Sequence, residues 1–205
     1  MITKHILEKL QKNIVLYDEK SENDYLVLFS IGKNHECYFK EISFKYYNFW
    51  HLLGCKDISN NSYQTYMDCK NHIDISEKIE LKCNISTFQE KDYAFNHVFD
   101  FVKNAKSIKI GYANKGPEKF QLTMALGNND GIIGYDIPKP YSNTFLFPKS
   151  CQKKNLSDVS NSVNKILLIL SKTCDDKLYT KIEYEIKKGI AKELIEQNKI
   201  VNCSI

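Results

Sequence analysis

The segment FQLTMALGNNDGIIGYDI, residues 120–137, decides the fold class of this chain. Two apolar runs, 120–126 and 132–137, flank the pentapeptide GNNDG at 127–131. Glycine, asparagine and aspartate tolerate the backbone conformations of tight turns, and such a cluster between apolar runs is typical of a β-hairpin. We therefore predict two adjacent antiparallel strands in the second half of the chain.

Further elements are expected on both sides of this hairpin. Apolar or alternating runs predict strands at 25–31, 36–44, 107–112, 143–147 and 165–170. Helical spacing of apolar residues predicts helices at 3–13, 48–54, 62–71, 90–103 and 179–198. Most helices thus precede most strands, without the regular strand–helix alternation of a parallel sheet. This order indicates the α+β class, with N-terminal helices packed on an antiparallel sheet formed mostly by the C-terminal half, and a C-terminal helix.

The composition is that of a folded protein, with 42% hydrophobic and 26% charged residues among 205. No repeat, low-complexity tract or linker divides the chain, so we predict one domain over residues 1–205. Seven cysteines, an odd number without a Cys-x-x-Cys pair, favour reduced thiols in a cytosol. The first 14 residues lack the apolar core of a signal peptide, and no apolar run reaches 18 residues. The chain is therefore expected in the cytoplasm, without a membrane partner.

All 29 positively charged side chains are lysines, because the sequence contains no arginine. An AT-rich genome explains this bias most simply. The consequence is nevertheless physical, since lysine offers a point charge where arginine offers a planar fork that matches a phosphate. The net charge of +4 is too small to indicate nucleic-acid binding by itself.

Motifs for cofactor or metal binding are absent or weak. The sequence has no glycine-rich phosphate loop and no Gly-x-Ser-x-Gly elbow. Cys69 and His72 have a metal-like local spacing, but a zinc site needs three or four ligands and no second pair lies nearby in the sequence. We predict neither a cofactor nor a metal.

His51 is the first candidate for catalysis. It follows Trp50 and precedes Leu52 within the aromatic-rich stretch YYNFWHLLG at 46–54. Apolar surroundings would disfavour the charged imidazole and make His51 a tunable acid or base. The alternative is a buried imidazole that is hydrogen-bonded in the core.

The tetrapeptide FPKS at 147–150 is the second candidate. It follows a predicted strand, and Lys149 and Ser150 there offer a cation and a hydroxyl together. Such a pair could bind and polarise a phosphate. The alternative is a turn after the strand, with Lys149 solvated.

The order of these features resembles the phage and mobile-element branch of the barnase–EndoU–colicin–RelE-like nuclease superfamily. The resemblance rests on the element FWHLLG at 49–54, the segment GIIG at 131–134, the run FLFPKS at 145–150 and the strand at 166–170. It covers about residues 20–185. We predict a helical C-terminal extension over 180–205, which overlaps the end of this region. It implies a curved antiparallel sheet preceded by helices.

The resemblance also implies a function. Members cleave RNA without a metal, act as toxins or in phage–host conflict, and convert the 2′-hydroxyl and its phosphate into a 2′,3′-cyclic phosphate. By position, His51 would be a general acid or base, Lys149 would bind the phosphate and Ser150 would position it. The implied substrate is RNA, tRNA included, and a protein partner or inhibitor is a further expectation. The region 92–103, where members often carry an arginine, has only lysine as a cation.

Three hypotheses follow. The first is a small RNA-cleaving enzyme. The second is an inactive module that binds nucleic acid or protein, of the anti-defence or immunity type, in which the surface around His51 should be apolar and sealed. The third is a structural protein in which His51 is buried and bonded to backbone.

Overall fold

The computed structural model describes residues 2–31, 36–113, 115, 122–137 and 145–197. Its helical segments are α1 (Lys4–Ser21), η1 (Tyr46–Asn48), α2 (Phe49–Leu52), α3 (Ser62–Lys70), α4 (Ile85–Val98), α5 (Leu156–Val159) and α6 (Ile190–Glu196). Its strands are β1 (Asn23–Ile31), β2 (Glu36–Ile42), β3 (Cys55–Asp57), β4 (Ile79–Leu81), β5 (Lys109–Tyr112), β6 (Met124–Gly127), β7 (Ile132–Asp136), β8 (Phe147–Gln152), β9 (Asn164–Thr173) and β10 (Lys181–Glu185). The predicted α+β class is confirmed.

The hairpin predicted from residues 120–137 is the β6–β7 pair, as far as these residues are described. The backbone nitrogen of Asn128 donates to the carbonyl oxygen of Gly131 (3.0 Å), and the Asn128 side chain accepts from the nitrogen of Asp130 (2.8 Å). The turn residues therefore close the hairpin with their own polar groups.

The hairpin belongs to an eight-stranded antiparallel sheet with the order β2-β1-β9-β5-β6-β7-β8, in which β10 also pairs with β9. The sheet is curled, and its two end strands, β2 and β8, are joined by backbone contacts. Ile42, at the end of β2, bridges to Leu146, just before β8. The backbone nitrogen of Leu146 donates to the carbonyl oxygen of Glu41 (2.8 Å). The backbone nitrogen of Ser43 donates to the carbonyl oxygen of Leu146 (3.0 Å).

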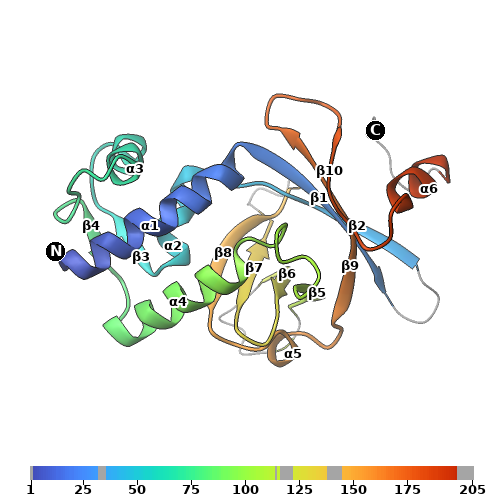
Figure 1. Ribbon diagram of the computed structural model, residues 1–205. Coiled ribbons are helices and arrows are strands. Elements are labelled where there is room, and N and C mark those ends of the chain that lie inside the picture. Colours follow the sequence, from blue (N-terminus) through green and yellow to red (C-terminus); the bar gives the residue numbers. More distant parts are fainter. Residues whose placement is uncertain (1, 32–35, 114, 116–121, 138–144, 198–205) are drawn as a thin grey trace.

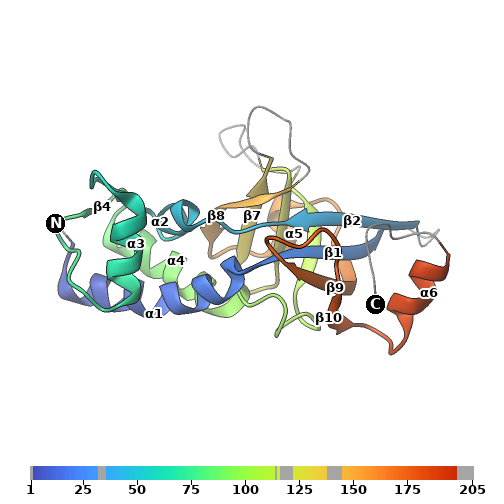
Figure 2. The same ribbon diagram turned by 90° about the horizontal axis from the view of Figure 1, so that it is seen from above.

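The two faces of the sheet carry different helices. Along β1, side chains alternate: Val27 packs into the large core shared with α1, α2 and α4, whereas Leu28 packs with Leu194 of α6. Figure 1 shows α1, α2, α3 and α4 gathered on one side of the molecule and α6 at the other end, and Figure 2 shows the same separation from above. An aromatic cluster fills the large core, with Tyr17 at its centre in contact with Phe44, Phe49, Tyr66 and Phe99.

The first helix is longer than its apolar spacing predicts. Thr3 caps it as expected, since its hydroxyl accepts from the nitrogen of Ile6 (3.4 Å). The helix continues through residues 14–21, where buried Ile14 and Tyr17 extend the apolar face before the polar residues 18–21. None of the helices within the described residues is long and apolar enough to cross a membrane.

The helix predicted at 179–198 is wrong in its first half. Residues Lys181–Glu185 form strand β10, and only Ile190–Glu196 are helical, after Gly189 in the left-handed region (φ +88°). Isoleucines four residues apart, such as Ile182 and Ile186, fit a strand as well as a helix, because four is also a multiple of two. The expected helical extension over 180–205 is corrected accordingly, and residues 198–205 lie outside the described part of the chain.

Candidate active site

His51 lies on a short helix that is otherwise buried. Its neighbours Phe49, Trp50 and Leu52 are at most 2% exposed, whereas His51 is exposed to solvent. The expectation that His51 sits among apolar groups is therefore wrong: those groups fix the helix to the core, and the imidazole takes the outer face. The buried, backbone-bonded imidazole of the alternative reading is excluded as well.

Gly54 ends this helical turn. Its φ of +70° lies in the left-handed region, and its nitrogen donates to the carbonyl oxygen of His51 (3.1 Å). A Cβ atom at Gly54 would stand 2.6 Å from the Sγ atom of Cys83. Glycine is thus required by both the backbone and the packing here, and it helps to define where His51 points.

The FPKS tetrapeptide is part of a strand and does not form a turn after one. Phe147–Gln152 form β8, which pairs with β7. A strand was predicted at 143–147, and its residues 143 and 144 lie outside the described part of the chain. The register shifts between Gly134 and Tyr135, so Pro148 opposes Tyr135 at an irregularity. A proline is tolerated at such a bulge in an end strand because no ladder hydrogen bond is lost. Lys149 is exposed there.

Lys149 is held by an acidic partner on the neighbouring strand. Its Nζ atom lies 2.5 Å from the Oδ2 atom of Asp136 at the end of β7. Asp136 also accepts from the Thr123 hydroxyl (2.9 Å) and from the nitrogen of Ile137 (3.0 Å). Partial burial acts to raise the pKa of Asp136, but the hydrogen bonds from Lys149 and Thr123 outweigh it and lower the pKa below its usual value. The carboxylate is therefore ionised at neutral pH.

His51 and Lys149 line one pocket, with a volume of about 620 Å³. The pocket is lined by Tyr47, Asn48, His51, Asp136, Ile137, Phe147, Pro148 and Lys149. One side comes from η1 and α2, which follow β2, and the other from the ends of β7 and β8. The bridge between Ile42 and Leu146 brings these segments together. An imidazole, an ammonium and a carboxylate thus face one open cavity, which is a combination suited to proton transfer and anion binding.

Ser150 is not among the residues that line this pocket. It lines a neighbouring pocket of about 270 Å³ with Lys91, Lys153 and Lys154, and its hydroxyl accepts from the Gln152 side chain (2.9 Å). Burial lowers the pKa of Lys91, whose Nζ atom donates to the carbonyl oxygen of Cys151 (2.8 Å). Lys149 and Ser150, adjacent in sequence, therefore serve different cavities.

Three polar lining residues were not candidates in the sequence analysis: Asp136, Tyr47 and Asn48. Asp136 ends the second strand of the predicted hairpin, but its pairing with Lys149 depends on the irregular β7–β8 register. Tyr47 and Asn48 stand in the same aromatic-rich stretch as His51, which is a signal that could have included them.

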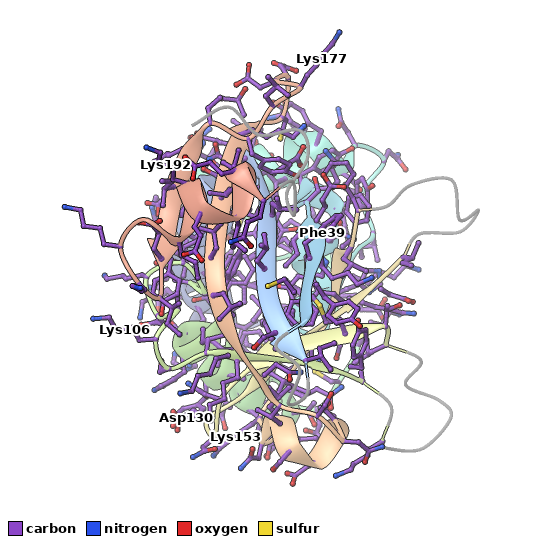
Figure 3. All side chains as sticks on the ribbon, turned by 90° about the vertical axis from the view of Figure 1, so that its right-hand side faces the viewer. Phe39, Lys106, Asp130, Lys153, Lys177 and Lys192 are labelled. Atoms are coloured by element: carbon purple, nitrogen blue, oxygen red, sulfur yellow. The ribbon has the colours of Figure 1, made fainter. Side chains whose placement is uncertain are left out.

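Within the described residues, no group of three or more histidine, cysteine, aspartate or glutamate side chains could hold a metal ion. Cys69 is buried, and His72 is exposed after the end of α3. Figure 3 shows Lys106, Lys153 and Lys177 at separate places on one face. Lys153 lies with Lys91 and Lys154 in the pocket of Ser150.

Comparison with known proteins gives one positive result. A family described as phage-Barnase-EndoU-ColicinE5/D-RelE like nuclease matches residues 9–188 of this chain. The resemblance drawn from residues 20–185 is thereby confirmed. A search of curated proteins and a search of solved structures each gave no match.

Proposed function

Because the chain belongs to the phage-Barnase-EndoU-ColicinE5/D-RelE like nuclease family, we propose that it is an endoribonuclease that works without a metal. The observation that carries this proposal is the shared pocket of His51 and Lys149. Catalytic groups must converge on one reacting atom, and these two reach one cavity from separate segments of the chain.

In the proposed reaction the RNA supplies its own nucleophile. The 2′-hydroxyl oxygen attacks the adjacent phosphorus and loses its proton, while the bond from phosphorus to the 5′-oxygen breaks and that oxygen gains a proton. The products are a 2′,3′-cyclic phosphate and a 5′-hydroxyl. Negative charge grows on the phosphate oxygens in the transition state, and the Lys149 ammonium stabilises it.

His51 performs one of the two proton transfers. It carries the one imidazole among the described lining residues, and an imidazole can either donate or accept a proton. Solvent in the open pocket serves the other transfer, or, where His51 is the acid, the ionised Asp136 accepts the proton of the 2′-hydroxyl. Asp136 also positions Lys149 through their ion pair.

The role of Ser150 as a positioning hydroxyl stays a prediction. Because its hydroxyl lies in the neighbouring pocket, it would act on the phosphate only through a substrate that spans both cavities. We therefore expect Ser150→Ala to lower the cleavage rate less than removal of the Lys149 ammonium does.

A binding module without catalysis is the second candidate. The observation in its favour is the absence of arginine, since Lys149 presents only a point charge to a phosphate. The exposure of His51 in an open pocket that also holds an ammonium and a carboxylate supports the enzyme, because a binding-only protein was expected to seal this surface.

The test is to incubate the purified protein with total RNA in excess chelator. The proposal expects cleavage by the wild type and little by His51→Ala. Intact RNA with the wild type, or equal cleavage by the two proteins, would contradict it and favour binding.

A further inference from the structure

We propose that the substrate is single-stranded RNA, and that the pocket holds one of its bases on the ring of Tyr47, with the base edge bound by Asn48. This inference rests on the proposed function and adds a substrate class and a base subsite to it. The residues that carry it play no part in the proton transfers described above.

Tyr47 has the geometry of a stacking surface. Its side chain lines the pocket and 53% of the residue is exposed, so the ring is accessible to a ligand in the pocket. Its ring meets that of Tyr46 at 5.4 Å and 79°. Tyr46 is part-buried and fixes Tyr47 in place, so little conformational freedom is lost when a base stacks on it.

The aromatic surface continues away from the pocket. Tyr46 also contacts Tyr63 of α3, with 5.5 Å between the ring centroids, and Tyr63 is 56% exposed. Tyr47 and Tyr63 are thus two exposed rings that both contact Tyr46. Successive bases of a single strand stack on such aromatic surfaces, whereas the bases of a duplex stack on each other and are not available.

Asn48 offers a polar group beside Tyr47. It precedes α2 in the place of a capping residue, yet its side chain makes no capping hydrogen bond. Its Oδ1 atom is buried and, among the described residues, has no hydrogen-bond partner. A buried acceptor without a partner is costly, and rotation of the amide toward the pocket that Asn48 lines would let an N–H group on the edge of a base satisfy it.

The position relative to His51 fits a base next to the cleaved bond. Tyr47 and His51 are four residues apart on the continuous η1–α2 segment, and both line the pocket with Lys149. A base on Tyr47 would therefore bring its own phosphate into the pocket that holds the imidazole and the ammonium.

Binding can be measured separately from cleavage. We would label a short RNA carrying 2′-O-methyl groups, which cannot be cleaved by this reaction, and follow fluorescence anisotropy with its single-stranded and duplex forms. Tyr47→Ala should weaken single-strand binding by about 5- to 150-fold, as expected for one lost stacking contact, and Tyr47→Phe by less than about twofold. Tyr93→Ala is the control, because Tyr93 is an exposed tyrosine on α4 outside the pocket. Asn48→Ala should reduce differences in affinity among oligonucleotides of different base.

The outcomes separate the two proposals. Tight single-strand binding that depends on Tyr47, with no cleavage of ordinary RNA, would sustain the subsite and sink the enzyme. Cleavage with unchanged binding by Tyr47→Ala would sink the subsite alone. Absence of binding by the wild type, or stronger binding of the duplex, would also overturn this inference.

Discussion

The backbone nitrogen of Leu146 donates a hydrogen bond of 2.8 Å to the carbonyl oxygen of Glu41, and this contact joins the two ends of the sheet. Glu41 lies in β2, shortly before the helix of His51, and Leu146 lies just before the strand of Lys149. The pocket therefore depends on closure of the sheet. Neither half of the chain contains the site without the other.

Replacement of His51 by alanine should lower RNA cleavage by about 10²- to 10⁴-fold, the usual contribution of a general acid or base. The same change should leave the midpoint of thermal unfolding nearly unchanged, because the side chain is exposed. Rate measurements and calorimetry on one preparation check both statements. A large loss of stability would mean that His51 acts through the fold.

Replacement of Lys149 by methionine should reduce both cleavage and RNA affinity. The logarithm of the binding constant should also depend less steeply on the logarithm of salt concentration, by about 0.7 for one lost contact to a single strand. Lys177→Met is the matched control, since Lys177 projects from the loop between β9 and β10 (Figure 3) and does not line the pocket. An equal change in the two variants would show that only net charge matters.

Lys149→Arg tests the absence of arginine directly. The guanidinium can still pair with Asp136 and offers two parallel hydrogen bonds to a phosphate. We expect cleavage at least equal to that of the wild type. Activity as low as that of Lys149→Met would mean that the size of the lysine, and not its charge, is required.

Asp136 should contribute to stability in a pH-dependent way. Its pKa is lowered in the folded protein, so the contribution is present above the unfolded value of about 3.9 and is lost as pH falls through the folded value. Asp136→Asn should therefore lower the free energy of unfolding at pH 7, by less than about 1 kcal/mol for this part-exposed pair. Denaturant titrations of both proteins from pH 7 to pH 2 should show the difference shrinking below about pH 4. A difference that stays constant to pH 2 would contradict the ion pair.

Gly54→Ala should destabilise the protein by more than Gly189→Ala does. Both glycines have positive φ, which costs an alanine about 1 kcal/mol. At Gly54 the new methyl group also meets the Sγ atom of Cys83 at 2.6 Å, whereas nothing lies within 4 Å at Gly189. Denaturant midpoints measure the difference. Equal losses would show that the backbone strain alone matters, and that Cys83 moves aside freely.

Much of the fold can be predicted from local patterns. The hairpin around residues 127–131 and the capping by Thr3 follow from turn and cap chemistry that needs no tertiary contact. The segment 181–185 could not be assigned in this way, because spacing by four residues fits both a helix and a strand. Pairing of Ile182 with Leu170 of β9 decides between them, and that contact is not encoded locally.

The sequence predicted which residues form the candidate site better than it predicted where their side chains lie. His51 and Lys149 were singled out from their neighbours, yet the sequence placed His51 among apolar groups and Lys149 after a strand, with a turn as the alternative. Burial of one face of α2 and the shifted β7–β8 register set their actual positions. Asp136 was missed because its link to Lys149 exists only through that register.

The most direct test of the central claim is the chemistry of the cut RNA ends. A single-stranded RNA of defined sequence is incubated with the protein in excess chelator, and the fragments are identified by mass spectrometry. Our account predicts a 2′,3′-cyclic phosphate on the upstream fragment and a 5′-hydroxyl on the downstream one, and neither with His51→Ala. A 3′-hydroxyl with a 5′-phosphate, or cleavage that stops when chelator is added, would contradict it.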